Sequence, residues 1–272
     1  MNVSPVTFIN LQSYPIDDLS SPGAQDLIEM FRTRLAVSGA LALPGFLTAH
    51  TTALLAEEGR QLDWAAHHYA TDHTVYFDVS DESVPDGHPK RRLVRTDKGN
   101  VPYDLIPASS LLRRLYEWDG LLNFVASVLN EPRLYRHGDP MAALNINAHT
   151  EGQELGWHFD RTEFAVTLSL QQSEEGGVFE YVPNLRSKDD ENYDAVARIL
   201  AGEHDCVREL PAEPGTLTLF RGHHSLHRVT PSRGPSKRLM AALSYVREPN
   251  VTFSAYARNL FYGRGTALSE AA

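Results

Sequence analysis

Apolar positions recur at helical spacing near the start of the chain. Between residues 20 and 39, Leu27, Phe31 and Leu35 fall on one face of a helix. The segment begins with Ser–Pro and ends with glycine, which suits the two ends of a helix. The pattern predicts a first amphipathic helix here.

Three more helices are predicted before residue 133. One follows Thr48, whose hydroxyl suits the N-cap position of "LTAHTTALLAEEGRQLDWAAHH". Two more are indicated by "ASSLLRRLYEWDGLLNFVASVLNEP", and they stop at Pro132. Residues 70–107 lie between these patterns and have many turn formers but no strong period. We expect a loop with short strands there, which covers the substrate-binding side of the fold.

From about residue 133 the apolar positions alternate with a period of two, which is typical of strands. The alternating segments are "MAALNINAH", "FAVTLSLQ", "PGTLTLF", "LHRVTP" and "KRLMAALSYV". The glycine pair of "GGVFEYVP" suits a hairpin turn, and "DENYDAVARILAGE" predicts one interrupting helix. The expected fold is mainly β with flanking helices, a double-stranded β-helix (jelly-roll or cupin-like barrel). We expect one domain over residues 1–272, helix-rich over 1–132 and with the barrel core over 133–250.

Composition limits the class of protein. The chain has 272 residues, 42% hydrophobic and 22% charged, with a net charge of −10, which is ordinary for a globular protein and disfavours a nucleic-acid partner. Its densest basic run, "HPKRRLVRTDK", has acidic neighbours, so we expect a solvated loop in which a lone arginine could hold an anionic group. A single cysteine, Cys206, rules out an intramolecular disulfide. The start of the chain does not resemble a secretory signal and no apolar run is long enough to cross a membrane, so we expect a cytoplasmic protein.

The segment "ELGWHFDRTEF" carries the candidate chemistry. His158 and Asp160 stand two residues apart and would share one face of a strand. Alone, this pattern favours an exposed ion pair. The segment "FRGHHSLHRVTP" offers a further histidine, and His227 lies in its strand-like part, whereas His223 and His224 suit a loop. Two histidines and one carboxylate are typical of non-haem Fe(II) sites with open positions for other ligands.

An arginine is the expected partner for the carboxylate of a bound cosubstrate, because its planar fork matches two carboxylate oxygens. Arg228 follows His227 directly and would point the other way on a strand. Arg233 lies in a Ser–Arg–Gly–Pro turn, where a solvated position is expected. Arg238 opens the last strand, on the face of Met240 and other short or slender side chains. We favour Arg238 and keep Arg233 as the alternative.

Together these motifs resemble those of the 2-oxoglutarate/Fe(II)-dependent oxygenases. The pattern HxxGxxLxxHxD from His149 to Asp160 is similar to the family's HxD region, and a distal histidine followed by a well-spaced arginine comes later, in His227 and Arg238. The resemblance covers residues 145–246. Together with "EGGVFEYVPNLR", "DENYD" and "FYGR", it extends to a bacterial subgroup of amino-acid hydroxylases and radical halogenases.

The resemblance implies roles for individual residues. His158, Asp160 and His227 match the Fe(II) ligands, and Arg238 matches the partner of the distal (C5) carboxylate of 2-oxoglutarate.

Two more residues, Asn147 and His149, lie on the strand from which a further cosubstrate hydrogen bond often originates. Asn147 could equally face solvent. There are two departures from the family pattern. Met240 stands where many relatives have a hydroxyl residue, and His149 stands where a tyrosine is common.

Asp160 also bears on the reaction. In halogenating members of the family a small residue replaces this carboxylate, so that a halide can bind the iron. The aspartate therefore favours an Fe(II)-, 2-oxoglutarate- and O₂-dependent hydroxylase of a small polar molecule, such as an amino acid or a natural-product precursor. Desaturation or cyclisation by the same chemistry stays open. The alternatives are a cupin-like metal-binding protein without enzymatic activity, which would not need Arg238, and an oxygenase that modifies a protein side chain.

Overall fold

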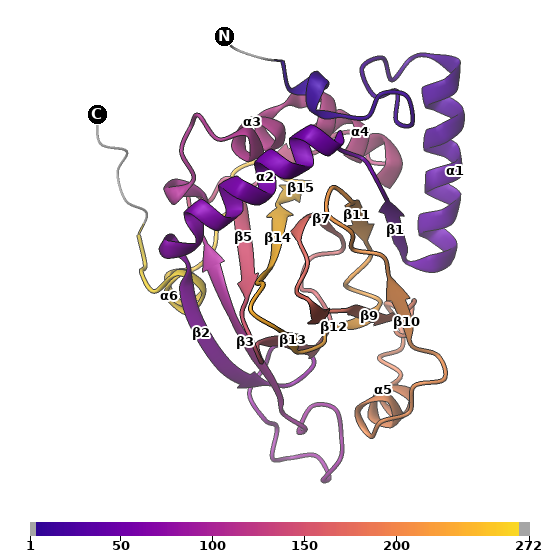
Figure 1. Ribbon diagram of the computed structural model, residues 1–272. Coiled ribbons are helices and arrows are strands. Elements are labelled where there is room, and N and C mark those ends of the chain that lie inside the picture. Colours follow the sequence, from indigo (N-terminus) through magenta and orange to yellow (C-terminus); the bar gives the residue numbers. More distant parts are fainter. Residues whose placement is uncertain (1–3, 267–272) are drawn as a thin grey trace.

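A computed structural model describes residues 4–266 of the chain (Figure 1). Its α-helices and short 3₁₀ helices are α1 Pro22–Ser38, α2 Ala49–Leu62, α3 Leu111–Glu117, α4 Asp119–Leu129, α5 Tyr193–Leu200, α6 Ala255–Tyr262, η1 Pro5–Phe8, η2 Asp63–Ala65 and η3 Tyr103–Leu105. The helix starts follow the capping chemistry of the sequence. The side chains of Ser21 and Thr48 accept hydrogen bonds from the first turns of α1 and α2, and Gly39 ends α1 in the left-handed conformation.

Antiparallel strands make up the centre of the molecule. The strands are β1 Ala40–Leu43, β2 His67–His73, β3 Val94–Val101, β4 Tyr135–Arg136, β5 Leu144–His149, β6 Glu154–His158, β7 Ala165–Gln171, β8 Glu175–Gly176, β9 Phe179–Val182, β10 Arg208–Leu210, β11 Leu217–Phe220, β12 Leu226–Val229, β13 Ser232–Arg233, β14 Arg238–Leu243 and β15 Tyr245–Val246. Eleven of them form one sheet in the order β1-β11-β7-β14-β5-β3-β6-β12-β9-β10, with β2 paired to β3. This curled sheet forms a nearly closed barrel and confirms the expected jelly-roll architecture (Figure 1).

The alternation in the strands decides which side chains face the barrel interior. In β5, the buried Leu144 and Ile146 join the core beneath the helices, while Asn145 and Asn147 line the cavity on the opposite face. In β14, Leu239, Ala241 and Leu243 enter the same core, and the residues between them face the cavity. The alternation of side chains along each strand therefore places apolar residues in the core on one face of the sheet and the intervening residues in the barrel cavity on the other.

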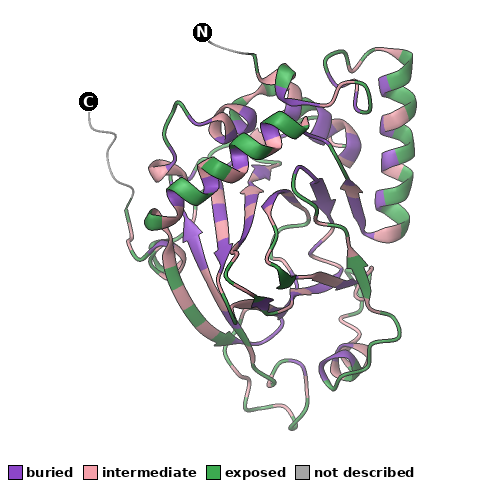
Figure 2. Ribbon diagram, viewed as in Figure 1, coloured by how far each residue is buried: buried purple, intermediate pink, exposed green. Residues whose placement is uncertain are grey.

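Helices α1 to α4 lie together on one side of the barrel (Figures 1 and 2): α2 packs on β7, α1 packs on β1 and α4, and α3 joins α2 and α4. An aromatic cluster joins them: the ring of Phe124 in α4 stacks on that of Phe46, which lies between β1 and α2, with centroids 6.0 Å apart. Within residues 4–266, none of the helices combines the length and the apolar character needed to cross a membrane.

The structure corrects two expectations. Strands β1, β2 and β3 lie before residue 133, so the barrel is not limited to residues 133–250, and residues 70–107 hold the longest strand of the sheet, β3, and most of β2. Gly176, which ends β8, and Gly177 both have positive φ, but β9 pairs with β10 and β12 and not with β7 or β8. The chain therefore crosses here from one layer of the barrel to the other, and the predicted hairpin is wrong.

Strand β3 joins the two layers of the barrel. Its residues 99–101 pair with β5, whereas Thr96 and Asp97 pair with β6. Lys98 lies between these two groups of paired residues. On the other edge of β3, Lys98 pairs with Tyr69 of β2. Lys98 and Asn100 both line the barrel cavity. The strand that the sequence pattern missed thus contributes directly to the interior.

Candidate metal centre and pocket

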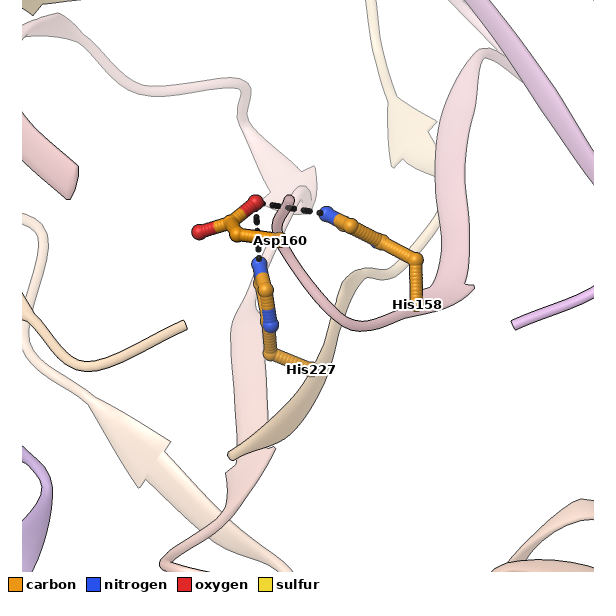
Figure 3. A group of neighbouring side chains, drawn as sticks. All are labelled: His158, Asp160 and His227. Carbon is orange, nitrogen blue, oxygen red and sulfur yellow. Dashed lines mark ion pairs between the residues drawn. The ribbon is translucent and has the colours of Figure 1, made fainter. Parts of the chain in front are cut away.

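Three side chains converge at one end of the barrel. His158 ends β6 and lies directly opposite His227 of β12, and Asp160 follows two residues after the end of β6. The Nε2 atoms of His158 and His227 lie 3.6 Å and 3.5 Å from Oδ1 of Asp160 (Figure 3). The three candidate ligand atoms lie within 4.8 Å of one another. The structure therefore brings together the three residues that were predicted from the sequence as metal ligands.

Backbone contacts fix the orientation of both imidazoles. Nδ1 of His158 donates to the carbonyl of Gly156 at 2.7 Å, and Nδ1 of His227 donates to the carbonyl of Ser225 at 2.9 Å. A carbonyl only accepts, so each Nδ1 must carry a proton, and the Nε2 of a neutral ring then presents a lone pair. Both lone pairs are directed at the space beside Asp160, which is the arrangement that metal-binding histidines require.

The ionisation states also suit a cation. Burial, followed by the neighbouring His227 ring, lowers the pKa of His158 to about 4, so the ring is neutral at pH 7. Burial opposes ionisation of Asp160, but the imidazoles of His227 and His158 outweigh it and keep the pKa of the carboxyl below its ordinary value. The set offers two imidazole nitrogens and one carboxylate. Oδ2 of Asp160 is buried without a hydrogen-bond partner among the described residues, so this donor set fits a divalent transition metal.

Aromatic rings enclose the two histidines. Phe77 lies against His158 with ring centroids 4.8 Å apart, and Phe179 and Phe220 lie 5.5 Å and 4.7 Å from His227. These rings pack against both imidazoles and make the surroundings of the two histidines largely apolar. On the backbone side, the N–H of Asp160 donates to the carbonyl of Gly222, and a Cβ on Gly222 would overlap the Asp160 carboxylate.

The triad opens onto a cavity of about 320 Å³ inside the barrel. Arg238 of β14 lies in this cavity directly opposite His149 of β5, and both side chains are buried. Arg238 makes no hydrogen bond or ion pair with any residue of the described chain, and burial lowers its pKa to about 10, so the guanidinium stays charged. Both ring nitrogens of His149 are buried and also lack partners there. A buried cation without a partner in a cavity is a site for an anion.

The other arginines and histidines considered from the sequence do not belong to the metal cluster or to the anion site. Arg228 pairs with Glu180 at 2.6 Å and covers the ring of Trp157, away from the cavity. Arg233 is exposed, as expected for its turn. His223 and His224 lie in the turn before β12, and neither belongs to the group that could hold a metal.

Lys98 was not singled out from the sequence. Its ammonium donates to Oδ1 of Asn147 at 2.6 Å inside the cavity. Asn147 therefore faces the cavity, which settles the open question of its direction. The basic run that contains Lys98 looked like a solvated loop, but its end forms β3. Thr96, Lys98 and Asn100 alternate along the chain as residues on one face of a strand do. Because all three are polar, a search for alternating hydrophobic residues does not detect this strand.

The C-terminal segment forms the remaining wall of the cavity. Phe253, Phe261 and Tyr262 line it, and the Tyr262 hydroxyl donates to Oδ1 of Asn145 at 2.9 Å. Helix α6 lies beside β2 and β3 in Figure 1. No role was assigned to these residues from the sequence beyond the "FYGR" element of the family resemblance.

Comparisons with known proteins agree with this architecture. The sequence model of the family Halogenase D matches residues 24–259. A search of curated proteins gave no significant match. Among solved structures, an oxidoreductase of the 2OG-Fe(II) oxygenase family from Burkholderia pseudomallei is 15% identical, with a TM-score of 0.54 over 82% of this chain and 92% of that chain.

Two further structures give similar values. The alpha-ketoglutarate-dependent epimerase SnoN from nogalamycin biosynthesis is 15% identical, with a TM-score of 0.55 over 82% of this chain and 83% of that one. HygX from Streptomyces hygroscopicus, solved with nickel and 2-oxoglutarate, is 17% identical, with a TM-score of 0.52 over 82% and 86%. The chain belongs to the Halogenase D family, and its fold is that of the 2OG-Fe(II) oxygenases.

Proposed function

We propose that this protein is an Fe(II)- and 2-oxoglutarate-dependent dioxygenase that hydroxylates an unactivated C–H bond of a small molecule. The observation that carries the proposal is one cavity that contains both the His158, Asp160 and His227 cluster and the buried, unpaired Arg238. A protein that only stores or binds a metal would have no use for a buried guanidinium beside the metal site. Solved proteins of the same fold, HygX and SnoN, hold a metal together with 2-oxoglutarate or alpha ketoglutarate.

In this proposal His158, Asp160 and His227 hold Fe(II), and Arg238 binds the distal carboxylate of 2-oxoglutarate. Fe(II), 2-oxoglutarate and O₂ together supply the oxidising chemistry that breaks the C–H bond. The protein's own residues orient the partners and exclude water. Arg238 does this through its planar fork, and the phenylalanine rings around the histidines keep the site dry. His149 and Asn147, which also line the cavity, are candidates for further cosubstrate contacts.

Asp160 supports hydroxylation over halogenation, in spite of the family's name. A halide would need the position on the metal that this carboxylate fills. Oδ1 of Asp160 lies beside the Nε2 atoms of both histidines and the backbone of Gly222 packs closely against the carboxylate, so in this proposal the carboxylate would fill that position. The fold alone does not fix the outcome, since SnoN has the same fold and is an epimerase. Desaturation or cyclisation by the same site is the alternative outcome.

The substrate in this proposal is a small molecule such as an amino acid or a natural-product precursor. The cavity is enclosed by the barrel and α6, and its volume suits a molecule of this size. A screen for substrate-stimulated succinate formation tests the function directly. We expect succinate, with Fe(II), 2-oxoglutarate and O₂ all required, and a product heavier by one oxygen. Absence of any 2-oxoglutarate binding in the presence of Fe(II) would overturn the proposal.

A further inference from the structure

The cavity contains a second cation besides Arg238. Lys98 lies where β3 changes partner from β5 to β6, and the sheet register places it in line with His149 of β5 and Arg238 of β14. Neighbouring strands are about 4.8 Å apart, so Lys98 and Arg238 are separated by roughly two strand spacings across the cavity wall. His149 stands between them and is kept neutral, because burial and these two cations lower its pKa well below the ordinary value.

Lys98 has a polar contact but no counter-ion. Its ammonium donates to Oδ1 of Asn147, and among the described residues it forms no ion pair within 4.0 Å. Three charged side chains line the cavity in the described chain: Lys98, Arg238 and Asp160. The carboxylate of Asp160 is taken up by the two histidines of the metal cluster. The positive charge of Lys98 therefore faces a mainly apolar cavity without a partner, which is a costly arrangement.

The bound cofactors would not balance this charge. The two charges of Fe(II) and the one of Arg238 are matched by Asp160 and by the two carboxylates of 2-oxoglutarate. In the proposed site one of those carboxylates would face the metal cluster, and the other would pair with Arg238. The charge of Lys98 is then left over in the loaded site, and the remaining component, the substrate, is the one that can neutralise it.

We propose that Lys98 is a specificity-determining residue that binds an anionic group of the substrate, a carboxylate in the first instance. This rests on the proposed function. The ring of Tyr69, which pairs with Lys98 in the sheet, and the rings of Phe253 and Phe261 also line the cavity and would contact the apolar part of the same molecule. Specificity for an anion follows from the physics, because a neutral analogue would leave the ammonium unpaired in the filled site.

The test uses the full-length protein loaded anaerobically with Fe(II) and 2-oxoglutarate. The probes are free amino acids, each compared with its own carboxamide, which lacks the carboxylate. Their binding is followed by the change in the visible absorption of the Fe(II)–2-oxoglutarate complex. We expect acids to bind at least tenfold more tightly than the matched amides. Lys98→Met should remove this difference, Lys98→Arg should restore part of it, and Lys188→Met, which changes an exposed lysine, should leave it unchanged.

The dissociation constant of 2-oxoglutarate is measured on the same variants. We expect a change of less than threefold in Lys98→Met. A larger loss of 2-oxoglutarate binding would assign Lys98 to the cosubstrate and overturn the inference. So would equal binding of acids and amides, or failure of every acid to bind to a wild-type protein that does bind 2-oxoglutarate. If the wild type develops no Fe(II)–2-oxoglutarate absorption at all, the proposed function itself has failed.

Discussion

His158 and His227 are cross-strand neighbours: β6 and β12 place them directly opposite each other, with ring centroids 4.0 Å apart. Two strands of the same layer thus supply both nitrogens of the cluster, and each ring is held by a carbonyl of its own strand region. The positions of the two imidazoles are therefore set by the sheet, and only Asp160 comes from the segment that follows β6.

The first expectation follows from this pairing. His158→Ala or His227→Ala should each abolish tight Fe(II) binding and turnover, because two remaining protein ligands do not hold the ion. Calorimetric titration with a divalent metal under anaerobic conditions measures the loss. His224→Ala is the matched control, since His224 lies in the adjacent turn outside the cluster. Metal binding that survives in His227→Ala but is lost in His224→Ala would move the ligand to His224.

The second expectation concerns the cosubstrate. Arg238→Ala should raise the apparent Michaelis constant for 2-oxoglutarate roughly 30-fold or more, since loss of a buried charged partner costs about 2–5 kcal/mol. Arg238→Lys should recover only part, because an ammonium lacks the fork of the guanidinium. The exposed Arg233 offers a control of the same residue type. If Arg233→Ala has the large effect and Arg238→Ala does not, the assignment is reversed.

The third expectation is that Gly222→Ala disables the metal site without touching a ligand. The added methyl group would overlap the Asp160 carboxylate and displace it. We expect weaker metal binding by at least tenfold while the protein stays folded, as judged by circular dichroism. Gly23→Ala is the control, because a Cβ there meets no atom within 4 Å, and the change lies in the first turn of α1. Normal metal affinity in Gly222→Ala would show that Asp160 has room to move.

The strands that were predicted correctly and those that were missed differ in what their faces touch. In β5 and β14 one face packs on the helices, so apolar residues alternate with polar ones and the period is visible. In β3 one face lines a polar part of the cavity and the other carries Arg95 and Asp97, so neither face is apolar. The pairing of Lys98 with Asn147, which are 49 positions apart, depends on the fold and leaves no local trace in the sequence.

In the candidate site, too, some residues could be predicted from the sequence and others could not. The metal cluster could be predicted because the HxD spacing and the distal histidine and arginine follow a family pattern. The cavity wall formed by residues between Phe253 and Tyr262 could not, because its role arises only when α6 packs beside β2 and β3.

The fourth expectation concerns pH and stability. Burial and the nearby Arg238 lower the pKa of Lys98 from 10.5 to about 8. The unfolded chain then binds more protons than the native one between about pH 8 and pH 10.5, so Lys98 makes the free energy of unfolding rise with pH in that window. Denaturant unfolding should show this rise in the wild type relative to Lys98→Met. At pH 7, without ligands, Lys98→Met should be more stable by about 1–3 kcal/mol. If the wild type and Lys98→Met had the same free energy of unfolding both at pH 7 and in that window, Lys98 would have to be well solvated.

The last expectation concerns Asp160 and the reaction outcome. Asp160→Gly would remove one metal ligand and open its position to water or chloride. We expect this variant to lose hydroxylation and not to gain efficient chlorination. Transfer of a halide also needs room for the anion and a substrate carbon held nearer to the halide than to the oxygen, and the Phe77 and Phe179 rings that pack on the two histidines restrict that space. Mass spectrometry of wild-type and variant reactions in chloride and in chloride-free buffer measures both outcomes. A chlorinated product from the wild type would contradict the argument, because it would place a halide on a metal whose third protein position Asp160 already fills.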